Sequence, residues 1–160
     1  MKKINTLILA AAFIGTLSNC TSKGEPNPQG QLLTTEQIKA LSKDQSMNGK
    51  LVEVEGYAGI CNSMFVTKGK KNEMIVYTDG FCKGEKLMDM QVNISRGDIA
   101  ITGDEPRNFG SFADDKNLSN EALTFTTDDY QEVANGRLKF SGKLVYNGDN
   151  YYLENVTIHK

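Results

Sequence analysis

Few residues in this sequence could carry out chemistry, and their spacing does not indicate catalysis. The single histidine, His159, is the penultimate residue, and no serine or cysteine lies near it in an arrangement typical of a nucleophile and its base. Acidic pairs occur at Asp104-Glu105, Asp114-Asp115 and Asp128-Asp129. Adjacent carboxylates are typical of solvated loops and helix caps, and none of these pairs has the spacing of a calcium loop. Phosphate-binding, dinucleotide-binding and zinc motifs are absent as well, so the sequence predicts no enzyme, no metal site and no cofactor.

The thiols are more informative, beginning with Cys20. Lys2 and Lys3 precede an uncharged apolar run over residues 7–17, and Leu17-Ser18-Asn19 leads from this run into Cys20. A run of 11 residues is shorter than the roughly 20 that a membrane-spanning helix needs, but it is typical of a signal peptide. The alternatives are an uncleaved anchor and an ordinary secretory signal with a cysteine at this position by chance.

This arrangement resembles the lipobox of bacterial lipoproteins, in which signal peptidase II cuts before the cysteine and a lipid is attached to its sulfur. The resemblance implies a cleaved signal peptide over residues 1–19, a lipidated polar tether over 20–32 and a folded domain over 33–160. It also implies membrane attachment through the lipid on Cys20, outside the cytoplasm, on the outer or the inner membrane of the cell envelope. The tether contains two prolines and two glycines and is expected to need no structure of its own.

The other two cysteines, Cys61 and Cys82, are predicted to form a disulfide. Exported proteins fold in an oxidising compartment, where two remaining thiols usually pair. A redox pair or part of a metal site is the alternative, although the chain has no C-x-x-C motif. A bridge across about 20 residues would stabilise the fold by roughly 3 kcal/mol.

Composition limits the range of functions. Without residues 1–19 the chain has 141 residues, the size of one domain with a hydrophobic core of its own. It keeps 16 basic residues against 20 acidic ones, for a formal charge of −4. Proteins that bind nucleic acids without sequence preference are normally basic, because they neutralise phosphates. The charge therefore argues against nucleic acid as a partner.

The pattern of residues predicts a β-rich domain that begins with a short helix. Thr34 to Gln37 fits a capping box, which predicts a helix over 34–43. Alternating or β-branched segments then predict strands over 51–57, 64–67, 73–78, 88–94, 99–101, 137–146 and 151–158. The strands 64–67 and 73–78 are expected to form a hairpin that the disulfide closes, and Asn147 to Asn150 is expected to form a tight turn.

The segment between residues 103 and 136 is the least regular. Residues 103–127 are expected to form a long connection, in which Arg107, Phe109 and Phe112 either face a ligand or fold back onto the core. Thr127 and the two following aspartates are expected to cap a short helix that extends through Val133.

Residues 49–56, 136–142 and 151–158 resemble the first, fourth and fifth strands of the oligonucleotide/oligosaccharide-binding (OB) fold, in its tRNA-anticodon-like branch. The resemblance covers about 49–79 and 128–158. It implies an all-β fold with a five-stranded barrel, with extra strands inserted between residues 80 and 127, and with a helix between strands three and four.

The OB fold binds ligands on strands two and three and on the loops that join strands one to two and four to five. The resemblance therefore implies binding residues Phe65, Lys68, Tyr77, Tyr146, Asn147 and Tyr151. Since alternation buries every second position of a small barrel, some of these rings must instead fill the core. The expected function is that of a non-enzymatic envelope lipoprotein that binds a peptide, a glycan or a partner protein. The alternatives are a single-stranded nucleic-acid or oligosaccharide binder and a structural subunit of an envelope complex.

Overall fold

The protein is all-β, as the strand patterns predict, and the part of the chain that the structure describes contains one short α-helix. A computed structural model describes residues 25–61, 66–80, 82–95, 107–112 and 118–160. Its elements in chain order are β1 (Gln31–Leu32), α1 (Thr35–Ala40), the 3₁₀ helix η1 (Gln45–Met47), β2 (Leu51–Gly59), β3 (Lys71–Asp79), β4 (Lys83–Ile94), β5 (Phe109–Phe112), β6 (Leu123–Thr126), β7 (Glu132–Ala134), β8 (Arg137–Asn147) and β9 (Asn150–His159).

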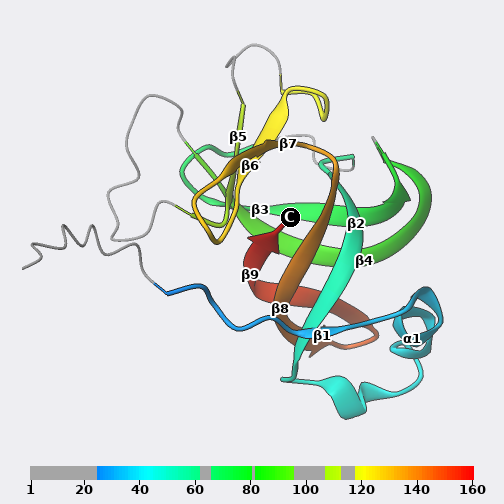
Figure 1. The fold of residues 1–160 in the computed structure, drawn as a ribbon. Coiled ribbons are helices and arrows are strands. Elements are labelled where there is room, and N and C mark those ends of the chain that lie inside the picture. Colours follow the sequence, from blue (N-terminus) through cyan, green and yellow to red (C-terminus); the bar gives the residue numbers. More distant parts are fainter. Residues whose placement is uncertain (1–24, 62–65, 81, 96–106, 113–117) are drawn as a thin grey trace, which may run out of the picture.

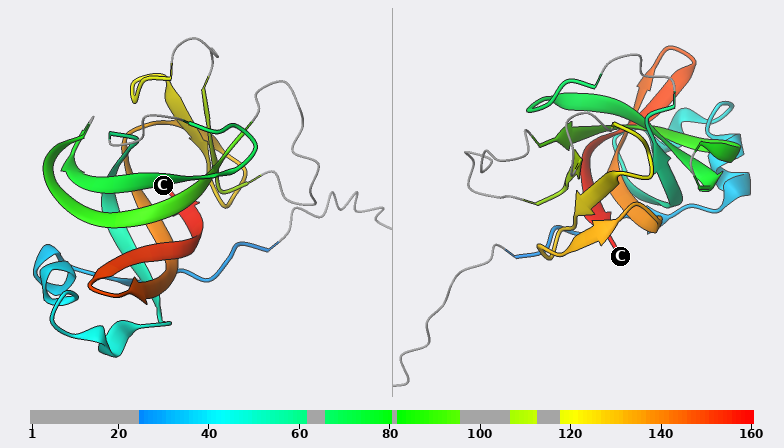
Figure 2. Two further views of the ribbon diagram at one scale, coloured as in Figure 1. Left: turned by 180° about the vertical axis from the view of Figure 1, so that it is seen from behind. Right: turned by 90° about the horizontal axis from the view of Figure 1, so that it is seen from above.

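Five strands form a closed circuit of pairings. β2 pairs with β8, β8 with β9, β9 with β4, β4 with β3, and β3 again with the end of β2. All of these pairs are antiparallel except β4 with β9. The strands curve around one another (Figure 1), and β3 and β4 lie in front when the molecule is seen from behind (Figure 2, left). From the end of β4 the sheet continues outward through β5, β6 and β7.

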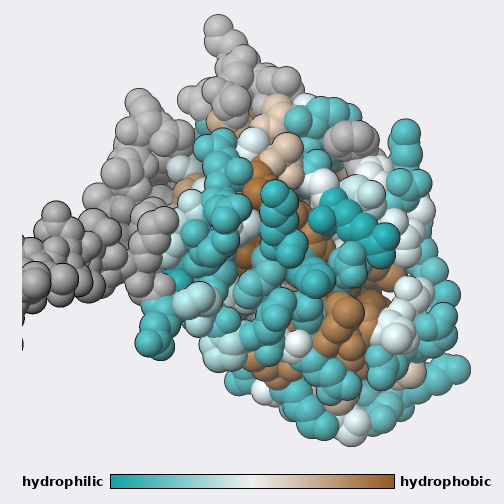
Figure 3. Space-filling view, in the orientation of Figure 1, coloured by the Kyte–Doolittle hydropathy of each residue, from teal (hydrophilic) through white to brown (hydrophobic). Residues whose placement is uncertain are grey.

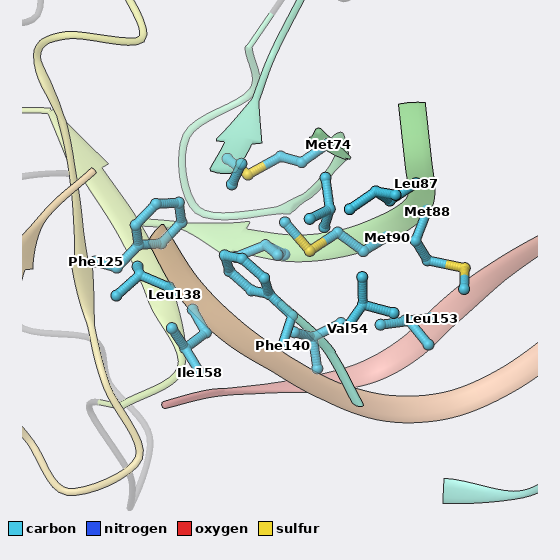
Figure 4. Packing of buried hydrophobic residues seen from close by; sticks show 14 of the residues in the cluster. Val54, Met74, Leu87, Met88, Met90, Phe125, Leu138, Phe140, Leu153 and Ile158 are labelled. Carbon is cyan, nitrogen blue, oxygen red and sulfur yellow. The ribbon is translucent and has the colours of Figure 1, made fainter. Parts of the chain in front are cut away.

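The alternating side chains of the circuit point inward and form the core. β4 buries Met88, Met90, Val92 and Ile94, as its alternation predicts, and β8 buries Phe140 and Leu144. These side chains meet those of β2, β3, β6 and β9 in the interior (Figure 4). Phe125 of β6 packs edge-on against Phe140, with the ring centroids 6.0 Å apart. The outward extension of the sheet therefore contributes to the same core.

The predicted capping box begins α1. Thr34 Oγ1 accepts a hydrogen bond from the Gln37 amide, and Gln37 Oε1 accepts one from the Thr34 amide. Ile38 and Leu41 turn inward and are 3% exposed. α1 contacts β4, where Lys39 forms an ion pair with Glu85 at 3.0 Å. The helix ends at Ala40, three residues earlier than predicted.

The predicted hairpin of residues 64–67 with 73–78 is wrong where the structure describes it. Val66 and Thr67 are not in a strand, while Met64 and Phe65 lie outside the described residues. The segment around 73–78 pairs instead with β2 and β4. The four residues 64–67 are too short a run to show which strand residues 73–78 pair with, because strand pairing depends on distant parts of the chain.

Two predictions for the segment between β4 and β8 are also corrected. Residues 103–127 contain two strands, β5 and β6, rather than only an irregular connection. Phe112 is buried and therefore belongs to the core, and Arg107 is buried as well. The helix predicted after Thr127 is a turn followed by β7, and Asp128 is buried instead of capping a helix. The strand expected over 99–101 lies outside the described residues.

Part of the predicted tether is in contact with the sheet. β1 pairs with Val52 and Glu53 of β2, in parallel, and the Gly30 amide donates a hydrogen bond to Ser141 Oγ. Figure 3 shows that the surface over β1, β2 and β8 is mostly hydrophilic, with a small hydrophobic area over β1. Leu32 in β1 is 49% exposed. Residues 25–32 thus run along the folded domain in a fixed path.

Candidate functional site

A groove lies on the outer face of β3 and β4. Its volume is about 400 Å³, and it is lined by Gly59, Ile60, Cys61, Glu73, Ile75, Lys86, Asp89, Gln91, Asn147, Asn150, Tyr151 and Tyr152. A second hollow of about 220 Å³ shares Lys86, Asp89, Asn150 and Tyr151 with the groove and continues to Asp149. Together the two hollows form an elongated surface depression that ends at the turn between β8 and β9.

The strand register explains why these residues meet. Gly59 of β2 is opposite Ile75 of β3, Ile75 is opposite Asp89 of β4, and Asp89 is opposite Tyr152 of β9. This row crosses four strands on the outer face of the sheet. Glu73 and Gln91 form the next pair along β3 and β4. Residues two apart in a strand share a face, so both pairs lie on the groove side.

A bulge in β4 shapes the middle of the groove. Val76 pairs with Met88 but Tyr77 pairs with Lys86, which leaves Leu87 as an extra residue. Leu87 and Met88 are therefore both buried, and the residues on either side of them both face outward. As a result Lys86 Nζ forms an ion pair with Asp89 Oδ2 at 2.6 Å. Bulges often redirect side chains in this way next to binding sites.

The disulfide forms one end of the groove. Cys61 and Cys82 are bonded, as predicted, with their Cα atoms 5.8 Å apart. The bond joins Cys61, just after the end of β2, to Cys82 in the turn between β3 and β4. The sequence instead predicts a bond across the base of a hairpin. A Cβ on Gly59 would lie 2.7 Å from both sulfur atoms, so only glycine fits beneath the bond.

The sheet extension braces this end. Asn120 Oδ1 accepts a hydrogen bond from the Ile60 amide, and Asn120 Nδ2 lies 3.0 Å from Cys82 Sγ. Asn135 Nδ2 donates to the carbonyls of Ala58 and Asn120, both at 3.0 Å. The end of β2 and the disulfide are thus held by Asn120, which precedes β6, and Asn135, which follows β7.

Two of the six binding residues implied by the OB resemblance line the groove. Asn147 and Tyr151 are part of its wall. Tyr77 is half-buried on β3 beyond Ile75, and Lys68 lies in the turn that precedes β3, next to the end of β4; neither lines the groove. Phe65 lies outside the described residues.

Tyr146 holds α1 and is not among the residues that line the groove. Its hydroxyl donates to the carbonyls of Leu41 and Asp44 at 3.0 and 3.1 Å. The hydroxyl of Tyr151 donates to the Ile38 carbonyl at 3.3 Å, and the two tyrosine rings are 5.8 Å apart. Burial, together with the negative charge of Asp44, raises the pKa of Tyr146 above its usual value. The tyrosines therefore join the C-terminal end of α1 to the β8–β9 turn.

The remaining groove residues were not identified from the sequence. The alternation over residues 88–94 already indicated that Asp89 and Gln91 face away from the core, and this signal could have placed them on the outer face. Glu73 and Ile75 alternate with buried residues in the same way. Tyr152 gave no such signal, because only the parallel pairing of β9 with β4 brings it to Asp89.

The chemistry of the groove is that of a binding surface. It combines two carboxylates, three side-chain amides, two tyrosines and two isoleucines with one lysine, which is paired. These groups can donate and accept hydrogen bonds and offer apolar area to a ligand. Within the described ranges, no group of three or more histidine, cysteine, aspartate or glutamate residues is arranged to hold a metal ion.

No family model, curated protein or solved structure matches this chain. In the part of the chain that the structure describes, no helix has the length and apolar character needed to cross a membrane. The candidate site therefore rests on its own geometry.

Proposed function

We propose that this protein is a non-enzymatic lipoprotein of the bacterial cell envelope, and that its OB-like barrel binds a ligand in the groove over β3 and β4. The groove is the observation that carries the proposal. The OB resemblance implies a ligand on strands two and three beside the loop between strands four and five, and the groove lies between β3, β4 and the β8–β9 turn. The lipid anchor rests on residues 2–20 of the sequence.

The strand circuit supports the OB-like barrel. β2, β3 and β4 follow one another in space, and β8 returns to lie beside β2. This is the order of a Greek key, on which the OB fold is built. α1 lies at the start of the domain, and the described residues between β4 and β8 (107–112 and 118–136) contain no α-helix of the kind that the OB fold has between strands three and four.

The groove favours a short glycan over a nucleic acid. A phosphate backbone would meet the carboxylates of Glu73 and Asp89, and the one lysine in the lining is paired with Asp89. Nucleic-acid binding requires unopposed cations. Carboxylates and amides beside tyrosines can instead share hydrogen bonds with sugar hydroxyls, which both donate and accept.

The groove also disfavours a peptide that would add a strand. Strand addition needs a free sheet edge. Ile75 already pairs with Gly59 on one side and Asp89 on the other, and Asp89 pairs with Tyr152 on its far side. A ligand at the centre of the groove must therefore bind to side chains, which again favours a compact molecule rich in hydroxyls.

A titration followed by NMR tests the ligand class. The amide and side-chain NH₂ signals of the ¹⁵N-labelled mature chain with Cys20→Ser would be recorded with maltotriose, with triacetylchitotriose and with octathymidylate. Shifts confined to groove residues with either sugar, and none with the oligonucleotide, support the proposal. Shifts only with the oligonucleotide would replace it with the nucleic-acid alternative.

A matched pair of amides on one strand provides the control. Gln91 lines the groove, whereas Asn93, two residues further along β4, is exposed and does not. Gln91→Ala is expected to weaken sugar binding by about fivefold or more, since a hydrogen bond is typically worth about 1 kcal/mol. Asn93→Ala is expected to leave the affinity unchanged.

Mass spectrometry of the N-terminus tests the anchor separately. The protein is expressed in a bacterial host and isolated from its membranes. A diacylglyceryl group on Cys20 at the start of the mature chain is expected. A chain that begins at Met1 or carries an unmodified Cys20 would contradict the anchor while leaving the groove untested by that result.

A further inference from the structure

Residues 25–32 are fixed to the domain by pairing with β2 and by contacts with segments more than 80 residues away. The amide and the side-chain nitrogen of Asn27 donate to the two carboxylate oxygens of Asp128, at 2.5 and 2.7 Å. The guanidinium of Arg107 donates to the Glu25 carbonyl at 2.8 Å. Further along the segment, Gly30 binds Ser141 and β1 pairs with β2. We call residues 25–32 the docked segment.

The groups that hold the docked segment are buried charges. The side chains of Arg107 and Asp128 are 3% and 2% exposed. Asn108 Nδ2 also donates to Asp128 Oδ1, at 2.8 Å. If the docked segment left, the Asp128 carboxylate would lose both hydrogen bonds from Asn27. Hydrogen bonds to an ionised carboxylate are among the stronger ones, so these two bonds favour the docked position.

The docked segment and the groove lie at opposite ends of β9. Asn150, Tyr151 and Tyr152 at the start of β9 line the groove. Near its end, the Ile158 amide donates a hydrogen bond to Asn108 Oδ1, and the Ile158 carbonyl accepts one from the Asp128 amide. Eight residues separate Asn150 from Ile158, which corresponds to about 26 Å of strand. In Figure 1 the docked segment begins on the left of the domain, while β3, β4 and the β8–β9 turn extend to the right. The view from behind shows the same separation with left and right exchanged (Figure 2, left).

The length of chain between Cys20 and Glu25 then limits how the domain can turn. Five residues span at most about 18 Å. A domain the size of residues 25–160 has a radius of about 18 Å when treated as a sphere. A sphere held by a tether as long as its own radius can roll by no more than about 90° from the attachment point. Its far side cannot reach the surface that holds it.

Without the docking, this limit would disappear. If the chain were free up to Leu33, thirteen residues would separate Cys20 from the domain and could span about 47 Å. A chain that starts at the far pole of the domain and passes around it to the membrane needs about 46 Å, so any face could then meet the lipid surface. The difference depends on the contacts of Asn27, Gly30 and β1.

We propose that the docked segment orients the domain on its membrane, with the surface around Glu25, Asp128 and His159 toward the lipid headgroups and the groove directed away from them. The inference rests on the proposed lipid on Cys20. It gives the groove access to ligands in the surrounding compartment and prevents it from closing against the bilayer.

Fluorescence quenching in vesicles tests this orientation. The full lipidated protein would be placed in phosphatidylcholine vesicles that contain a lipid with a nitroxide headgroup. A fluorophore would be attached through Lys160→Cys, at the docked end, or through Asp149→Cys, at the groove; both residues are exposed. Quenching at position 160 is expected to be at least about threefold stronger than at position 149, because the geometry keeps the groove on the far side.

Two variants distinguish the docked segment from other causes. Ten glycine and serine residues inserted between residues 24 and 25 leave every docking contact in place but give a tether of about 54 Å, so the difference in quenching should vanish. The double variant Asn27→Pro with Gly30→Ala should have the same effect, since it removes both donors to Asp128 and places a Cβ against the Val52 carbonyl, which together detach the segment. Circular dichroism would show whether this variant remains folded.

The possible failures are separable. Protein that does not float with the vesicles has no lipid anchor, which overturns the proposed attachment and the inference together. Protein that floats but is quenched equally at both positions overturns only the orientation. A difference that survives the inserted linker also overturns it, because the tether length would then not be its cause.

Discussion

Two ion pairs at opposite ends of the molecule show how burial separates a structural site from a binding site. Arg107 and Asp128 lie 3.6 Å apart at the docked end, with side chains that are 3% and 2% exposed. Lys86 and Asp89 lie 2.6 Å apart in the groove, with side chains that are 53% and 39% exposed. We expect the closer pair to contribute less to stability, since water screens exposed charges and competes for their hydrogen bonds.

The surroundings of the two pairs differ in the same direction. Asp128 accepts hydrogen bonds from Asn27 and Asn108, and Arg107 lies over the Tyr130 ring at 5.3 Å from its centroid. In contrast, Asp89 and Lys86 share the open groove with unburied amides. The buried pair is therefore committed to the fold, whereas the exposed pair can exchange water for a ligand.

The largest difference in the free energy of unfolding is expected when the carboxylate of each pair is removed. Asp128→Ala leaves the Arg107 charge buried without its carboxylate, and we expect it to lower the free energy of unfolding by about 3–5 kcal/mol. The matched variant Asp89→Ala should cost less than about 1 kcal/mol. Urea denaturation of both variants measures the difference. Equal losses would mean that burial does not separate the two sites.

The disulfide, at one end of the groove, is expected to contribute nearly as much to the free energy of unfolding as the Asp128 carboxylate does. Cys61→Ser with Cys82→Ser frees a loop with a sequence separation of 21 residues. The free energy of unfolding should fall by about 3 kcal/mol. Treatment of the wild-type protein with a reducing agent should give the same loss. An unchanged unfolding midpoint in the double variant would show that Asn120 and Asn135 hold this end without the bond.

The space beneath the disulfide gives a smaller effect. Gly59→Ala places a methyl group 2.7 Å from both sulfur atoms and should cost about 2 kcal/mol through overpacking. Gly136→Ala is the control, since its new Cβ meets only the Ala134 carbonyl, at 3.8 Å. In the background without cysteines the cost of Gly59→Ala should shrink, and a double-mutant cycle measures this coupling. Additive losses would place the strain elsewhere.

Acid should weaken the docked end selectively. Burial opposes ionisation of Asp128, but the hydrogen bonds from Asn108 and Asn27 and the charge of Arg107 outweigh it and hold its pKa below the ordinary value. Its contribution is therefore present above the unfolded-state pKa of about 3.9 and is lost as the pH falls through the lower folded-state pKa. The stability gap between wild type and Asp128→Asn should narrow in this range. A difference in stability between wild type and Asp128→Asn that does not change with pH would contradict a lowered pKa of Asp128 in the folded state.

The smallest expected effect is that of Lys86→Ala on stability. Lys86 is exposed, and the loss of its ion pair should change the free energy of unfolding by less than about 1 kcal/mol. The same variant exposes the Asp89 charge in the groove, so it should weaken any residual binding of octathymidylate further. Thermal denaturation and the NMR titration measure the two effects. Stronger oligonucleotide binding in this variant would contradict the electrostatic argument against nucleic acid.

Local signals in the sequence predicted much of the fold. The capping box at Thr34, the alternation before Ile94, and the Asn147–Asn150 turn between two strands are all present in the structure. Each of these depends on contacts within a few residues, or on which face of a strand is buried. The pairing of Cys61 with Cys82 was predicted because few thiols were available, and the structure confirms it.

Most residues that line the groove were not predicted from the sequence, for a physical reason. Asn147 and Tyr151, which the OB resemblance implies, line the groove, whereas Tyr146, implied in the same way, does not line it and donates its hydroxyl to the Leu41 carbonyl after α1. Asp89 and Tyr152 meet only because β4 and β9, more than 50 residues apart, pair in parallel. A pairing between distant strands leaves no local pattern in either of them.

The sequence by itself determined that this chain is rich in β-strands and carries a small net negative charge, because composition and local periodicity are properties of the chain. Only the tertiary structure decided where its charges act. It buried Asp128 with Arg107 under the docked segment and left Asp89 open in the groove, although both are aspartates in polar stretches of sequence. Burial depends on what the rest of the chain places above a residue, and only the folded chain specifies that.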